Sequence, residues 1–168
     1  MEDFKFSTLE YKRPDFEKIG AFAEEITEKI KNAASYEELK GYMERMEEMS
    51  KNFSTDCTIA SIRHTLDTTD EFYEKEDAYI NDMVPTVMPK LLAMNDALME
   101  SKFRGDIEKE YGKQYFAQMD LQKKTFCEAN IPLMQKEAKL TDEYQKIMAT
   151  AEIPFEGETL NLYGIQKH

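Results

Sequence analysis

The feature that most constrains the fold is a pair of long apolar stripes with almost no linker between them. Apolar side chains recur at intervals of three and four over residues 16–33, and Pro14 before them suits the first turn of a helix. A second stripe covers residues 39–61, and Ser35 with Glu38 forms a capping box at its start. The short joint predicts two long helices that pack as antiparallel neighbours.

Helical spacing continues beyond this hairpin. Thr68 and Glu71 form another capping box, which predicts the start of a third helix. Pro85 and Pro89 each remove a backbone donor and crowd the preceding turn, so we expect a kink or a break near residues 83–84.

Two further helices are predicted in the second half of the chain. A helical pattern resumes after Gly105 and is weakened by Gly112 in its middle. Asn130 is a candidate N-cap for a last helix, whose apolar residues lie between positions 134 and 151.

The C-terminal end has a different pattern, because apolar residues alternate around residues 156–158 in the manner of a β-hairpin. The predicted fold is therefore all-α, with about five helices, a long antiparallel helical hairpin first and a short C-terminal β-hairpin. Residues 1–151 would form a helical lobe and residues 152–168 a β-hairpin tail that packs on the lobe or on a partner, as one domain overall.

A single hairpin is marginal in water unless it packs on something. The apolar side chains of the tail form a possible exposed interface, which would support a homo-oligomer. These residues are Ile153, Phe155, Leu160, Leu162 and Tyr163.

The charge excludes several classes of partner. The chain has 22 Lys and Arg against 34 Asp and Glu, a net charge of −12, which repels phosphate backbones and anionic lipid headgroups. No nucleic acid or membrane partner is expected. The N-terminal residues lack an apolar stretch of signal-peptide length, and no apolar run is long enough to span a bilayer, so a cytoplasmic location is expected.

Residues for catalysis or metal binding are scarce. His64 is the only internal histidine, and we interpret Arg63, His64, Asp67 and Asp70 as a structural network at a helix end. A di-iron bundle would need Glu-x-x-His pairs, but Ser61 stands three residues before His64. No catalytic residue and no metal ligand is therefore predicted.

Cysteine and methionine are two other residue types that can have functional roles. Cys57 and Cys127 lie far apart, without a paired metal or redox spacing, and we expect both to be free, buried thiols. Several of the eleven methionines lie on one stripe at residues 43–49. They are suited either to core packing, which we favour, or to an adaptable peptide-binding surface.

Four segments carry a family resemblance. They are KFSTLEYKRPDFEKI at residues 5–19, ASIRHTLDTTDEFYEKE at 60–76, SKFRGDIEKEYGKQYF at 101–116 and EIPFEGETLNL at 152–162. In order and spacing they resemble the helical region that precedes the catalytic domain of oligoendopeptidase F, a thimet-oligopeptidase-like family of zinc metallopeptidases. The resemblance extends over nearly the whole chain.

The resemblance implies a fold and an origin, but it transfers no site residue. In that family, the residues that bind zinc and polarise water are a His-Glu-x-x-His helix and a downstream glutamate. No His-Glu-x-x-His motif occurs in this sequence. The chain would be a non-catalytic lobe, part of a longer polypeptide or the product of a shortened gene. In the parent enzyme, such a lobe forms one wall of the substrate channel for short peptides.

The expected partners are the catalytic domain or short peptides, with no cofactor in this chain and zinc in the parent family. The alternative function belongs to another class of protein. The chain would then be a free-standing helical module that binds a protein or peptide through a groove rich in Met and Tyr.

Overall fold

The computed structural model describes residues 5–167, except for the side chain of Tyr163. The predictions for the Tyr163 side chain and for the terminal His168 therefore lie outside the described residues. The longer elements are α1 (Phe16–Asn32), α2 (Tyr36–Leu66), α3 (Glu71–Met99), α4 (Arg104–Tyr111), α5 (Gln114–Thr125) and α6 (Ile131–Thr150). The shorter ones are η1 (Phe6–Thr8), η2 (Glu128–Asn130), β1 (Ile153–Phe155), β2 (Glu158–Leu160) and α7 (Leu162–Ile165).

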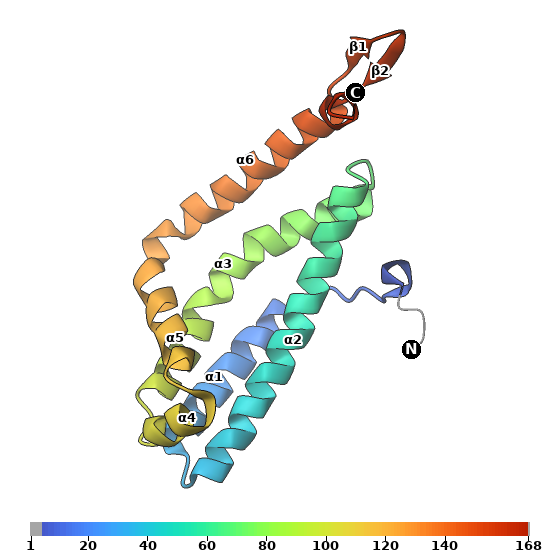
Figure 1. The fold of residues 1–168 in the computed structure, drawn as a ribbon. Helices are drawn as coiled ribbons and strands as arrows, with labels where there is room; N and C mark the ends of the chain where they lie inside the picture. The colour runs from blue at the N-terminus through green and yellow to red at the C-terminus, as the bar shows by residue number, and fades with distance from the viewer. Residues whose placement is uncertain (1–4, 168) are drawn as a thin grey trace.

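The long antiparallel hairpin of α1 and α2 is confirmed (Figure 1). Asp15 caps α1 by accepting a hydrogen bond from the backbone N–H of Lys18 at 3.0 Å. The capping box of α2 is also present, because Ser35 Oγ accepts from the N–H of Glu38 at 3.2 Å and the Glu38 carboxylate accepts from the N–H of Ala34 at 2.8 Å. These bonds satisfy backbone donors that a helix start leaves unpaired.

The expected start of α3 is wrong by two residues. Asp70, not Thr68, is its N-cap, and the Asp70 carboxylate accepts from the N–H groups of Phe72 and Tyr73. The negative charge of a carboxylate at this position also interacts favourably with the helix dipole, whereas a threonine hydroxyl has no charge.

Of the kink or break expected near residues 83–84, the break is absent, because α3 continues through Pro85 and Pro89. The helix bends along its length (Figure 1). Pro85 and Val87 are buried, so packing holds the helix together where the backbone has lost donors. The hydroxyl of Thr86 donates to the Met83 carbonyl at 2.6 Å, which satisfies one acceptor in this turn.

The single helix predicted after Gly105 is two helices, α4 and α5. Gly112 between them has φ +82°, a left-handed conformation that ends a helix and that glycine adopts without strain. The bundle accordingly has one helix more than expected. α6 begins next to Asn130 as predicted, although the Asn130 side chain makes no capping hydrogen bond with the described residues.

The hydrophobic core lies where α1, α2, α3, α4 and α5 meet. Its largest fully buried side chains are Ile26, Leu39, Leu98, Ile107 and Phe116. A second cluster, formed by Phe16, Ala60, Ile80 and Val87, joins α1 to the upper parts of α2 and α3.

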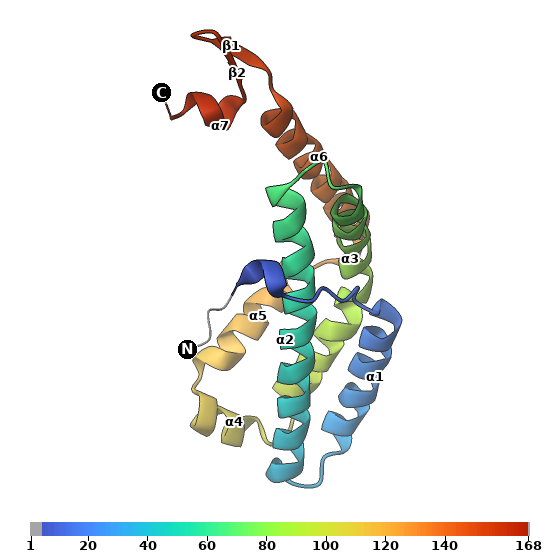
Figure 2. The ribbon, with the colours of Figure 1, turned by 90° about the vertical axis from the view of Figure 1, so that its right-hand side faces the viewer.

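The molecule has two differently built regions. Helices α1, α2 and α3 lie side by side, and α4 and α5 close one end of this bundle (Figures 1 and 2). α6 then runs back past α3 and carries the C-terminal elements beyond the other end of the bundle. We call residues 131–167, from α6 to α7, the arm.

The C-terminal β-hairpin is confirmed, with Ile153 paired to Leu160 and Phe155 to Glu158. Glu156 and Gly157 form the turn with φ 49° and 91°, and two positive φ values suit the right-handed twist of the strands. Leu162, which the sequence placed in the hairpin, begins the short helix α7 instead.

Candidate functional site

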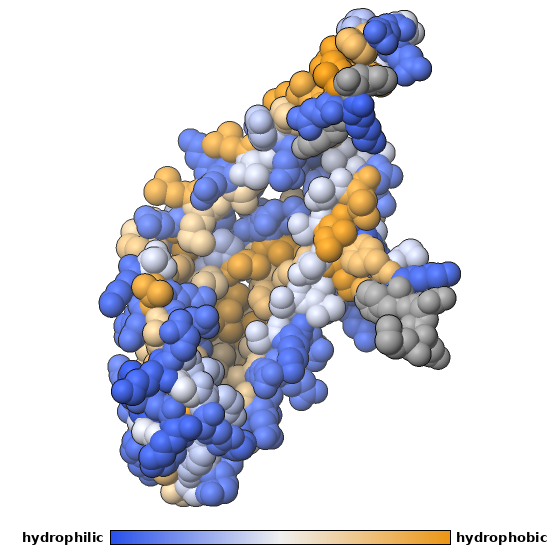
Figure 3. All heavy atoms as spheres, in the orientation of Figure 1, coloured by the Kyte–Doolittle hydropathy of each residue, from blue (hydrophilic) through white to orange (hydrophobic). Residues whose placement is uncertain are grey.

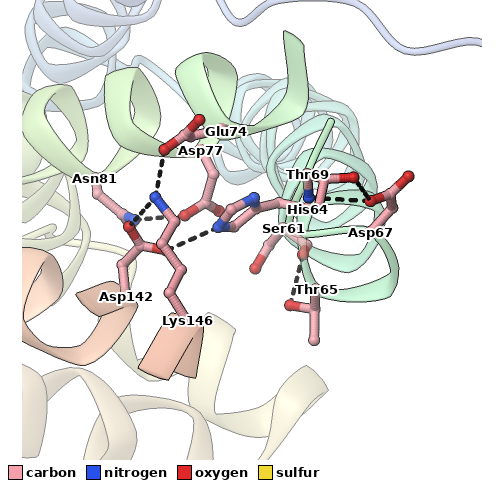
Figure 4. Close-up of polar contacts among 10 residues, drawn as sticks. All are labelled: Ser61, His64, Thr65, Asp67, Thr69, Glu74, Asp77, Asn81, Asp142 and Lys146. Carbon is pink, nitrogen blue, oxygen red and sulfur yellow. Dashed lines mark hydrogen bonds and ion pairs between the residues drawn. The ribbon is translucent and has the colours of Figure 1, made fainter. Parts of the chain in front are cut away.

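The predicted site histidine belongs to a polar cluster between α2, α3 and α6. His64 is 4% exposed, and its Nε2 lies 2.7 Å from Oδ1 of Asp142 on α6 (Figure 4). Because a carboxylate only accepts, Nε2 carries the hydrogen in this pair. Lys146 contacts both Asp142, at 3.1 Å, and Glu74 on α3.

The electrostatics of this cluster favour the ionised carboxylates. Burial acts to raise the pKa of Asp142, but the hydrogen bonds from His64 and Lys146 outweigh it and hold the pKa below its usual value. The hydrogen bond from Lys146 likewise lowers the pKa of Glu74. The cluster is therefore a set of hydrogen bonds and ion pairs that fastens α6 to the bundle.

The structure separates the four residues predicted to form one network. Asp67 accepts from the N–H and the hydroxyl of Thr69, on the side of α2 that faces away from His64 (Figure 4). Asp70 caps α3, and Arg63 donates to the Tyr73 hydroxyl and to the Leu9 carbonyl. His64 makes no hydrogen bond to either aspartate, because Asp67 is the extended C-cap that follows α2 and Asp70 is the N-cap of α3.

This cluster does not fit a zinc site. Within residues 5–167, no three His, Cys, Asp or Glu side chains converge in a way that could hold a metal ion. His64 Nδ1 is buried and has no hydrogen-bond partner among the described residues, while Nε2 is taken by Asp142. A tetrahedral site needs further nitrogen, sulfur or oxygen ligands at that point, so we derive no chemistry through a metal.

A buried glutamate, which sequence reasoning missed, joins two of the segments that carry the family resemblance. Glu76 on α3 is 2% exposed and accepts hydrogen bonds from Arg13 Nε at 2.8 Å and from the Tyr11 hydroxyl at 2.7 Å. A second Arg13 nitrogen donates to its other oxygen. The Arg13 hydrogen bond lowers the pKa of Glu76, although burial opposes it. The signal was the position of all three residues within those segments.

The two cysteines are free, as predicted, but only one is shielded. Cys57 is half-buried and Cys127 is exposed, so the expectation that both are buried is wrong for Cys127 and only partly met for Cys57. Cys127 lies outside the packed bundle, in the connection that leads to α6. Burial raises the pKa of Cys57 to about 11, which keeps this thiol protonated and unreactive at neutral pH.

A candidate binding surface is a groove between α2, α3, α5 and the last residue of α4, with a volume of about 810 Å³. Six methionines line it: Met43, Met46, Met49, Met88, Met94 and Met119. Tyr111 and Tyr115 form another part of the wall, and Glu44 and Glu47 lie at the same surface. Figure 3 shows the apolar atoms inside the hollow between α2 and α5. We call this surface the methionine groove.

The methionine stripe contributes to the core and also lines the groove. Met43 and Met46 are buried in the core, as the packing interpretation requires, and they also form the floor of the groove. Met49 is only partly buried. Flexible thioether side chains adapt to ligands of different shape, and the volume is in the range of small-molecule and peptide sites.

Comparison with known proteins identifies the family. Residues 6–126 match the model of the Peptidase M3 N-terminal domain, which is more than half of the chain. The chain belongs to this family. The M3 N-terminal domain thus ends, by this match, before α6 begins. No curated protein is similar enough to be counted as a match.

Solved structures extend the likeness to the arm. A 3.1 Å X-ray structure designated oligoendopeptidase F is 37% identical to the M3 N-terminal domain and its arm, with a TM-score of 0.92 over 98% of this chain and 29% of the other. PZ peptidase A with an inhibitor gives 37% identity and a TM-score of 0.91 over 97% and 29% of the two chains. A structure designated oligoendopeptidase F from Bacillus anthracis str. Ames gives 35% identity and a TM-score of 0.88, over 93% of this chain and 29% of the other.

The resemblance stated from the sequence is thereby confirmed, and the chain spans less than a third of the length of these solved proteins. The structure adds one negative finding about membranes. No helix in the described part of the chain is both long enough and apolar enough to cross a bilayer.

Proposed function

We propose that this domain forms one wall of the peptide channel in an oligoendopeptidase F-like zinc metallopeptidase, with the methionine groove as the surface that meets the peptide. The observation that carries the proposal is the groove itself. It is concave, its floor is apolar, and its walls come from helices within the part of the chain that matches the M3 N-terminal domain.

The chemistry of the groove suits short peptides of varied sequence. Methionine side chains can repack around different apolar residues, so they supply contact area without strict selectivity. Tyr115 remains protonated, because burial raises its pKa, with nearby Tyr111 and Glu47 acting in the same direction. Its hydroxyl is therefore kept as a hydrogen-bond donor for a peptide carbonyl. The catalytic groups and the zinc would come from the remainder of the enzyme.

The test joins this chain to the remainder of the oligoendopeptidase F relative, as a chimera in which it replaces the part it matches. We expect Tyr111→Ala and Met49→Ala to raise KM for a quenched peptide of about eight residues several-fold, with kcat nearly unchanged, because they remove contacts made equally in ground and transition states. Leu66→Ala, at an exposed site on α2 outside the groove, is the control and should leave KM unchanged.

The alternative, a free-standing interaction module, is distinguished with the chain alone. A channel wall supplies only part of the contact surface, so the isolated chain should bind the same peptide weakly, with a Kd of about 1 mM. NMR spectra of methionine-methyl-labelled chain would then shift at Met49, Met88 and Met119 only at high peptide concentration. Tight, saturable binding by the isolated chain would favour the module, and unchanged KM in both chimera variants would remove the groove from the channel.

A further inference from the structure

The arm helix α6 is amphipathic, but its polar face is turned toward the bundle and its apolar face toward solvent. None of its 20 residues, all of which the structure describes, is buried. The face turned toward the bundle is largely polar, and its contacts are hydrogen bonds and ion pairs. Gln135 donates to the Asp82 carbonyl at 2.6 Å, Lys139 pairs with the Asp82 carboxylate at 3.1 Å, and Asp142 receives the bond from His64.

The opposite face of α6 is apolar and turned outward. Leu133, Leu140, Tyr144 and Ile147 follow one another at intervals of seven, four and three residues, which places them on one side of the helix. All four are exposed, from 54% for Leu140 to 67% for Ile147. Figure 3 shows apolar side chains following α6 toward the hairpin. We call these four residues the outer stripe, which is about 21 Å long.

A helix in a finished domain points its apolar stripe at its own core, and large exposed patches mark interaction sites. The outer stripe does the reverse, so the domain core of residues 6–126 is complete without α6. The family match shows the same boundary, since it ends at residue 126, before the first residue of α6.

The solved relatives contain polypeptide outside the part that this chain matches. The match to oligoendopeptidase F covers 98% of this chain at a TM-score of 0.92, so the 20 residues of α6 are within it and the helix keeps its place there. That match takes only 29% of the relative's chain. Outside the matched part, therefore, the relative has more than twice this length of further polypeptide.

We propose that the arm is the first part of the following domain, and that the outer stripe is the surface on which the remainder of an M3 peptidase polypeptide packs with an apolar face of its own. The boundary expected at residue 151 then moves to about residue 127, and the hydrogen bonds and ion pairs of α6 with α2 and α3 are an interface between two domains. This rests on family membership and not on the channel-wall proposal.

The reversed polarity suits such an interface. Contacts between domains of one chain are more polar than a domain core, which agrees with the cluster of His64, Asp142 and Lys146. The outer stripe, in contrast, has the composition of a core. A second copy of this chain is the rival occupant, and it would have to bring together two chains that each carry a net charge of −12.

The test compares one substitution in two contexts, the 168-residue chain alone and the chimera with the oligoendopeptidase F remainder. Leu140→Asp and, separately, Ile147→Asp place a carboxylate on the outer stripe. Gln145→Asp is the matched control, because it adds the same charge to an exposed position of the same helix beside the stripe.

In the isolated chain we expect each stripe variant to leave the unfolding midpoint within about 1 °C of the parent, because the side chains stay in water. In the chimera we expect a midpoint lower by about 5 °C or more and at least about tenfold faster proteolysis within α6. The control should change neither the unfolding midpoint nor the rate of proteolysis in either context. Equal effects in both contexts would overturn the proposal, as would a loss of stability in the isolated chain.

Two further measurements address a chimera that does not fold and the rival occupant. If the chimera does not fold, the same substitutions are made in the relative itself at the positions aligned with 140 and 147, with the same expected loss. Sedimentation of the isolated chain over a wide concentration range tests the rival. A dimer that Leu140→Asp abolishes would assign the stripe to a second copy and overturn the proposal, whereas a monomer supports it.

Discussion

The bundle and α6 differ in how the same sequence pattern is used. In α1 and α2, apolar side chains at intervals of three and four converge on a shared core and become fully buried, as Ile26 and Leu39 are. In α6 the same intervals produce an exposed outer stripe, and polar side chains make the contacts with the bundle. Periodicity therefore reports that a helix has an apolar face, but it does not report what covers that face.

The difference also concerns the kind of energy that holds each region. Burial of apolar surface stabilises the bundle, and this stabilisation is non-directional and roughly proportional to the buried area. α6 depends on a few directional bonds, each of which contributes modestly because water competes for the same groups. The bundle should therefore respond strongly to loss of volume, and the arm to loss of single polar atoms.

The largest contrast is expected between two leucines. Leu98 on α3 is 0% exposed, and Leu98→Ala should lower the free energy of unfolding by about 3 kcal/mol, since it removes buried methyl groups and leaves a cavity. Leu140→Ala on α6 should change it by less than about 0.5 kcal/mol. Urea unfolding of the isolated chain, followed by far-ultraviolet circular dichroism, measures both. Comparable losses would show that α6 is part of the bundle core.

Much of the fold could be predicted from the sequence, for local reasons. The hairpin of α1 and α2 follows from two uninterrupted stripes and a short joint, and the β-hairpin follows from alternation around Gly157. The sequence left open whether α3 would kink or break, because the penalty of a proline is a local quantity whereas the burial of Pro85 and Val87 is set by tertiary packing.

The site was harder to predict than the fold. Asp142 lies 78 positions after His64, and no local pattern connects them. The sequence therefore assigned His64 to its neighbours Asp67 and Asp70, which instead cap local backbone groups. The pair of Arg13 and Glu76 was missed for the same reason, since a buried carboxylate on a helix looks identical in sequence to a solvated one.

A second prediction tests whether one polar contact in the bundle is stronger than those of the arm. Arg13→Ala leaves the buried Glu76 carboxylate with the Tyr11 hydroxyl, and should cost about 2 kcal/mol in urea unfolding. The double variant Arg13→Ala, Glu76→Gln should recover about half of this, because no charge remains buried. A loss in the single variant of only a few tenths would mean that the N-terminal segment contributes little.

The same pair predicts a dependence on pH. The hydrogen bond from Arg13 is the main reason that the pKa of Glu76 is lowered in the folded chain; the Tyr11 hydrogen bond adds to it, and burial opposes both. Its contribution to stability is therefore fully present above the unfolded value of about 4.3 and is lost as pH falls through the lower, folded value. Unfolding free energies between about pH 6 and pH 3 should fall more steeply for the parent chain than for Glu76→Gln. Parallel curves would contradict this assignment.

The smallest effect is expected at His64, and it should be confined to the arm. His64→Gln removes the bond to Asp142, which is worth about 1 kcal/mol, and Lys146 remains as a second attachment. Amide hydrogen exchange in residues 131–150 should become about fivefold faster, while exchange in α1 stays unchanged. Thr65→Ala is the control, because Thr65 follows His64 and is exposed. It should leave amide exchange unchanged in both α1 and α6. If exchange accelerates equally in α1 and α6, the two unfold as one cooperative unit. The ion pairs would then be part of the stability of the bundle, and they would not be the separable contact that an interface between domains requires.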